Sequence, residues 1–61
     1  MKVLFLVWAG DELIHVEIMN DVSNTDLNAT ARALLKCGGV DVCRFYLVWG
    51  EKLVFAGEEK R

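Results

Sequence analysis

The segment Val22–Gly39, VSNTDLNATARALLKCGG, decides the fold because it predicts one helix, over residues 24–37, with clear signals at both ends. Ser23 is placed to cap the helix, and Asp26 stands three residues later, where a capping box carries an acidic or amide side chain. The paired glycines at the end of the segment favour helix termination. Apolar residues recur at helical spacing along one face: Leu27, Ala31, Leu34 and Leu35.

Two β-hairpins flank this helix, at residues 2–19 and 41–57. Each is rich in β-branched and aromatic residues and is interrupted by a glycine-containing pair, Gly10-Asp11 in the first and Gly50-Glu51 in the second. We therefore predict a single α+β domain over residues 1–61, in the order ββαββ, with a four-stranded sheet and the helix packed on one face of it.

The element order and lengths resemble those of the immunoglobulin-binding domains of streptococcal protein G, a β-grasp fold. The resemblance is topological and carries no function with it. It implies that the first and last strands lie parallel to each other at the centre of the sheet.

Composition excludes several classes of protein. With 54% hydrophobic and 26% charged residues in 61 positions, the chain is too apolar to be intrinsically disordered. Its longest apolar run, Val3–Ala9, is too short for a membrane span and runs into Asp11 without a signal-peptide cleavage pattern. A net charge of −2 argues against nucleic acid as a partner. Two cysteines are too few for a disulfide scaffold, so we expect a soluble, reduced, cytoplasmic protein.

Strand alternation separates the side chains of each hairpin into two faces. In the first hairpin the cleaner apolar set is expected to face the helix: Val3, Phe5, Val7, Ala9, Ile14, Val16 and Ile18. In the second hairpin the expected inward set is Cys43, Phe45, Leu47, Trp49, Val54 and Ala56, although a one-residue bulge would exchange the faces.

The opposite face of the sheet is then unusually apolar for a surface in contact with water. It contains the side chains that we predict to bind a partner: Leu4, Leu6, Trp8, Leu13, His15, Arg44, Tyr46, Val48, Leu53 and Phe55. Tryptophan, tyrosine and arginine are the residue types most enriched at interface hot spots. The sequence thus favours a non-enzymatic inhibitor or adaptor that occludes a surface of another protein, with Trp8, Tyr46 and Phe55 as anchors.

Two alternatives remain open at this stage. The first is an obligate homodimer whose sheets pack back to back, with function on the polar helix face formed by Asn28, Arg32 and Lys36. The second is a thiol enzyme that uses Cys37 or Cys43 with His15, although nothing in their spacing brings these residues together. Metal-binding and phosphate-binding motifs are absent from the sequence, so we expect no metal and no cofactor.

The N-terminal hairpin also resembles the opening of the Dmd antitoxins of T-even bacteriophages, which are similarly small proteins. The matching residues are Lys2-Val3, Phe5, Trp8, Glu12 and Glu17-Ile18, followed by Ala33-Leu34, Lys36 and Val42-Cys43. The resemblance covers about three quarters of the chain with at least one gap, and the arm from Glu51 to Gly57 has no counterpart. It implies a phage protein that binds and blocks a host toxin endoribonuclease, and it assigns no role to individual residues.

Overall fold

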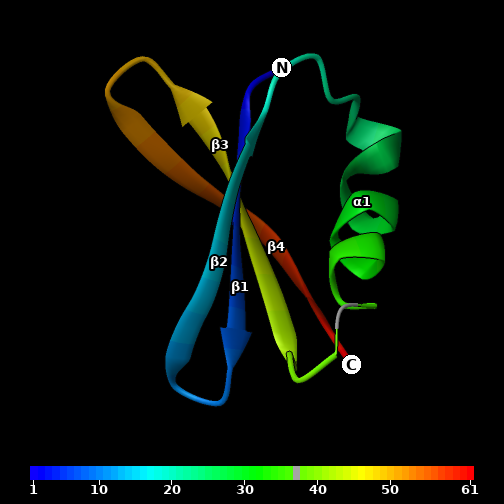
Figure 1. Ribbon diagram of the computed structural model, residues 1–61. Coiled ribbons are helices and arrows are strands. Elements are labelled where there is room, and N and C mark those ends of the chain that lie inside the picture. The colour runs from blue at the N-terminus through cyan, green and yellow to red at the C-terminus, as the bar shows by residue number, and fades with distance from the viewer. Residues whose placement is uncertain (37) are drawn as a thin grey trace.

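The computed structural model describes residues 1–36 and 38–61, and Figure 1 shows one sheet with a helix on one side. The elements are β1 (Val3–Ala9), β2 (Glu12–Met19), the 3-10 turn η1 (Asn24–Asp26), α1 (Leu27–Leu34), β3 (Val42–Trp49) and β4 (Lys52–Lys60). The predicted α+β fold is confirmed: four strands form one sheet from two hairpins, and the helix packs on one face. No helix among the described residues is long and apolar enough to cross a membrane.

The order of the strands differs from the β-grasp arrangement. The sheet runs β2-β1-β3-β4 and every neighbouring pair is antiparallel, so the prediction that the first and last strands lie parallel at the centre is wrong. β4 lies instead at an edge. The reason is its composition: β1 and β3 are apolar almost throughout, whereas β4 ends in Glu58, Glu59 and Lys60, which suit a strand with one side open to water.

The sheet is strongly twisted. In Figure 1 the two hairpins cross, so that the turn between β1 and β2 lies at the bottom and the turn between β3 and β4 lies at the upper left, away from α1. Both turns have glycine as the first loop residue with a positive φ, 62° at Gly10 and 60° at Gly50. This is the backbone that a tight hairpin of right-handed twist requires, and it confirms both predicted turns.

A β-bulge in each hairpin changes which side chains share a face. Across β1 and β2, Val7 pairs with His15 but Trp8 pairs with Leu13, so Ile14 is an extra residue. Beyond this bulge, the predicted faces of β2 are exchanged. Val16 and Ile18 lie away from the helix, contrary to prediction, and His15, Glu17 and Met19 lie on the helix side, opposite Val7, Phe5 and Val3.

The second bulge lies in β4, where Phe45 pairs with Gly57 and Tyr46 pairs with Phe55, leaving Ala56 as the extra residue. Ala56 is exposed, so its predicted inward position is wrong. Trp49, also predicted inward, is 75% exposed at the end of β3. The rest of β3 has the predicted faces, and β4 extends past residue 57 to Lys60.

The core lies between α1 and the two central strands. Phe5 of β1 and Phe45 of β3 are its largest fully buried side chains, and their ring centroids are 5.9 Å apart. The predicted helical stripe is confirmed, because Leu27, Ala31 and Leu35 are buried against this pair of strands. The other buried members are Val3, Val7, Val40 and Cys43.

The predicted helical segment begins at Asn24 as a 3-10 turn, α1 itself begins only at Leu27, and the predicted side-chain cap by Ser23 is not formed. Ser23 is the extended residue before the 3-10 turn, and its hydroxyl donates to the Asp26 carboxylate at 2.7 Å rather than accepting a backbone N–H. The regular helix ends at Leu34, before the predicted residue 37, and Cys37 lies outside the described residues.

Gly57 allows the Phe45 ring to pack directly on the backbone of β4. A Cβ atom built at this position would lie 2.9 Å from Phe45 Cζ. We expect Gly57→Ala to lower the free energy of unfolding by about 1–3 kcal/mol, because the ring in the core has to shift. Gly38→Ala is the matched control, since its Cβ would meet nothing within 4 Å. Urea denaturation measures both, and equal stability of the two variants would contradict the close packing.

A candidate protein-binding face

The sheet surface opposite α1, which we call the far face, is almost entirely apolar. The register places the following side chains on it: Leu4, Leu6 and Trp8 of β1; Leu13, Val16 and Ile18 of β2; Val42, Arg44, Tyr46 and Val48 of β3; and Leu53, Phe55, Glu58 and Lys60 of β4. Opposed residues form rows across the sheet, for example Ile18, Leu4, Tyr46 and Phe55. A face of this kind, on an antiparallel sheet, normally carries polar side chains.

Nine of the ten residues predicted to bind a partner lie on this face. The exception is His15, which the bulge at Ile14 moves to the helix side. Val16 and Ile18 belong to the far face and were missed. The signal that could have found them is local: two apolar residues, Leu13 and Ile14, follow each other at the bulge and interrupt the alternation that then runs from Ile14 to Ile18.

The outer strands contribute the most exposed apolar side chains. Ile18 of β2 is 54% exposed, and Leu53 and Phe55 of β4 are each 56% exposed. Phe55 also meets the Tyr46 ring edge-on, with centroids 5.5 Å apart, which holds the two aromatic rings in a fixed arrangement. The far face therefore presents ordered aromatic surface to the solvent.

A small polar cluster crosses the far face beside Trp8. The Arg44 guanidinium lies 5.6 Å from the centroid of the Trp8 ring, and its Nε donates to a Glu58 carboxylate oxygen at 3.4 Å. Lys60 Nζ lies 3.9 Å from the other oxygen of Glu58. Each contact is weak in water, but together they hold the Arg44 guanidinium over the indole ring.

The indole nitrogen of Trp8 is buried and has no hydrogen-bond partner. No other side-chain nitrogen or oxygen of the described residues is both buried and unpaired. A buried donor that has lost water without gaining an acceptor destabilises the free protein by about 1–3 kcal/mol.

The thiol–histidine pair that the thiol-enzyme alternative requires is not formed by Cys43. Its row across the sheet reads His15, Val7, Cys43, so a whole strand lies between the imidazole and the thiol. Burial, and secondarily the charge of Glu59, raises the pKa of the Cys43 thiol from 9.0 to about 11. At neutral pH this thiol is protonated and a poor nucleophile. Cys37, the other predicted thiol, lies outside the described residues.

The polar helix face is partly engaged within the chain. The Asn28 amide donates to Glu59 at 2.7 Å, and Arg32 donates to the other Glu59 oxygen at 3.3 Å. These contacts fasten α1 to β4 and leave Lys36 exposed at the end of the helix. Asn28 and Arg32, two of the three residues that the homodimer alternative assigns to function, therefore have a structural role in holding the helix to the sheet.

Concave and metal-binding sites give no competing candidate. The described residues enclose no pocket, and they contain no group of three or more histidine, cysteine, aspartate or glutamate side chains arranged to hold a metal ion. Searches of protein-family models, curated proteins and solved structures found no match to this chain. The far face therefore stands as the candidate site on its own physical properties.

Proposed function

We propose that this protein is a small, non-enzymatic binding protein, an inhibitor or adaptor, that uses its far face to cover a surface of a larger protein. The observation that carries the proposal is the exposure of large apolar side chains on the far face, where Ile18 and Phe55 lie in one row with Tyr46, Leu53 lies beside Val48, and Leu13 lies beside Trp8. Removing such a surface from water stabilises a complex by roughly 25 cal/mol for each Å² of apolar area.

The dimensions of the molecule suit this role. It extends 31 by 22 Å along its two longer axes, a projected area of about 700 Å², close to the roughly 800 Å² that each partner contributes to a standard interface. An apolar surface without a pocket among the described residues fits a macromolecular surface better than a small ligand, which is normally enclosed in a concave site. The mechanism we propose is steric: the bound domain excludes the target's other ligands.

Neighbouring residues of β4 provide a matched test of the proposed face. Leu53 and Phe55 lie on the far face, whereas Val54 lies between them on the helix side and is 49% exposed. We expect Phe55→Ala to weaken binding to the target by about 2 kcal/mol or more, roughly 30-fold, because a desolvated aromatic anchor is lost. Val54→Ala should leave binding unchanged.

The measurement is quantitative capture of cellular proteins by the immobilised chain, followed by titration of the captured protein with each variant. Circular dichroism of Phe55→Ala establishes that the variant is folded. If Val54→Ala weakens binding as much as Phe55→Ala, or if neither does, the far face is not the binding surface.

The resemblance to the Dmd antitoxins supplies the more specific form of the proposal, in which the target is a toxin endoribonuclease. Stoichiometric loss of RNA cleavage by such a toxin, abolished by Phe55→Ala and retained by Val54→Ala, would support it. Unchanged cleavage in an excess of the folded protein would dispose of this form while leaving the broader one open to the capture experiment.

A further inference from the structure

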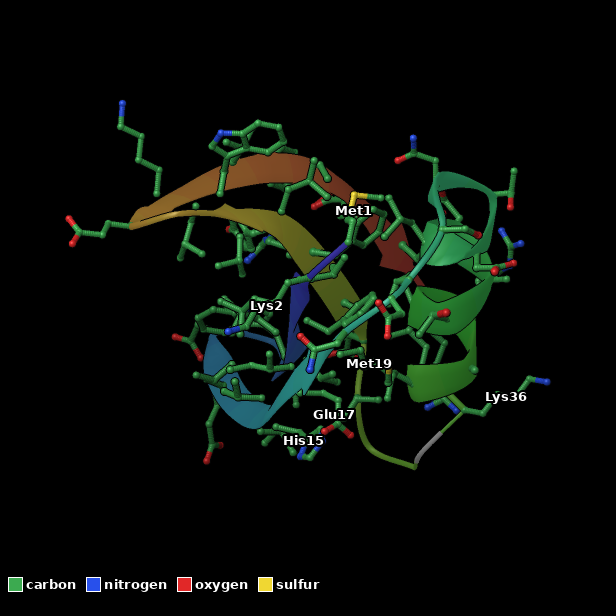
Figure 2. The ribbon with its side chains drawn as sticks, turned by 90° about the horizontal axis from the view of Figure 1, so that it is seen from above. Met1, Lys2, His15, Glu17, Met19 and Lys36 are labelled. Carbon is green, nitrogen blue, oxygen red and sulfur yellow. The ribbon has the colours of Figure 1, made fainter. Side chains whose placement is uncertain are left out.

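The outer edge of β2 is an unusually open sheet edge. Among the described residues, β2 pairs with β1 and with no strand on its other side. The helix packs over β3 and β4 rather than over β2. In Figure 2, His15 and Glu17 of β2 lie well apart from α1 and from Lys36, which follows the end of that helix. The backbone groups along this edge are therefore accessible to another strand.

The other edge of the sheet is protected in the ways typical of native edges. β4 contains a bulge at Ala56, and then a run of charges at Glu58, Glu59 and Lys60. β2 has a bulge near its start, at Ile14, but the stretch from Ile14 to Met19 contains no proline, glycine or lysine. Of the two edges, β2 is the one that permits strand pairing.

The polar side chains of β2 are arranged so that the strand complements itself. His15 and Glu17 flank Val16 and share the helix-side face, where His15 Nε2 and Glu17 Oε1 are 3.5 Å apart. If two copies pair antiparallel about a two-fold axis at Val16, His15 of each copy lies opposite Glu17 of the other. Ile18 then lies opposite Ile14, and Val16 lies opposite itself.

Neighbouring registers lack this complementarity. A two-fold axis at Glu17 would place the Glu17 carboxylates of the two copies opposite each other, which is destabilising. An axis at His15 would place Glu17 of each copy beside the bulge of the other copy and not opposite His15. A two-fold axis that passes between two residues would set a far-face side chain of one copy opposite a helix-side side chain of the other. Directly opposed residues of antiparallel strands lie on the same face, so these registers are excluded. We infer that the chain forms a homodimer through β2, in the register centred on Val16, which joins two sheets edge to edge.

This inference goes beyond the proposed function, because the pairing uses backbone groups at the edge and leaves the far face uncovered. Edge pairing makes the two far faces one continuous surface, with Val16 and Ile18 of both copies at its centre. The dimer is thereby suited to a partner that is itself two-fold symmetric, since an isologous assembly presents the same surface twice.

Light scattering and sedimentation velocity, over a series of protein concentrations, test the dimer directly. We expect the wild-type chain to change from monomer to dimer with concentration. His15→Glu should raise the dimer dissociation constant about tenfold or more, because it places like charges opposite each other at two symmetric positions. The double variant His15→Glu/Glu17→His exchanges the two residues and should restore dimerisation.

Hydrogen exchange supplies an independent readout, since edge pairing protects outward-pointing amides of residues 14–18 in wild type and not in His15→Glu. A wild-type chain that stays monomeric throughout the series would overturn the inference. So would a dimer insensitive to His15→Glu but abolished by Phe55→Ala, because the two copies would then be stacked through their far faces. His15 and Glu17 lie on the helix side, so substituting them leaves the far face unchanged. Dimerisation is therefore tested with the His15 and Glu17 variants, and target binding is tested separately with Phe55→Ala and Val54→Ala.

Discussion

Replacing Phe45 by alanine is expected to lower the free energy of unfolding by about 3–5 kcal/mol. Phe45 is 1% exposed, contacts Phe5 across the two central strands and packs on the backbone of Gly57. The substitution removes a whole ring from a core that contains few residues, so the vacated volume cannot be refilled. A chain of this length is typically stable by about 3–9 kcal/mol, and much of that margin would be lost.

Phe55 is the natural control for this prediction, because it has the same side chain on the opposite face of the same hairpin. It is 56% exposed, and Phe55→Ala should cost about 1 kcal/mol or less, chiefly through the lost contact with Tyr46. Urea denaturation followed by circular dichroism measures both variants. If the two substitutions destabilise the chain equally, the division of the sheet into a core face and a far face is wrong.

The second large effect is a loss of stability at alkaline pH caused by Cys43. Its thiol is buried, and its pKa is raised from 9.0 to about 11. Well below pH 9, the pKa of the unfolded chain's thiol, the group is protonated in both the folded and the unfolded chain and has no effect on the pH dependence. As the pH rises from 9 towards 11, the unfolded chain releases the proton and the folded chain retains it, so unfolding becomes easier.

A pKa difference of about two units corresponds to about 2–3 kcal/mol of stability lost over this range. We expect the urea midpoint of the wild-type chain to fall steeply between pH 8 and pH 11. Cys43→Ala should be less stable at pH 8, because it leaves a cavity, but its stability should fall less with pH. The difference between the two pH profiles isolates the contribution of Cys43 from that of every group common to both proteins. Parallel profiles would show that the buried thiol is not responsible.

The sequence by itself determined the elements and the nature of the unusual surface. Both hairpin turns, the position of the helical segment and its buried stripe followed from local signals: glycine pairs and apolar residues at helical spacing. These signals act over a few residues, so neighbouring positions suffice to identify them. The excess of large apolar residues over what one helix covers was also evident, and it predicted an apolar far face.

Only the tertiary structure decided which strands are neighbours and which residues share a face. β1 and β3 lie at the centre of the sheet, since the charged end of β4 is more stable at an edge. This preference depends on comparing whole strands with one another, which a local sequence pattern does not do. The bulge at Ile14 exchanges the faces of His15 and Val16, and the adjacent apolar pair Leu13-Ile14 does not by itself say which of the two residues is the extra one. Strand register depends on how the paired strands fit the twist of the whole sheet, so it emerges when the sheet is assembled.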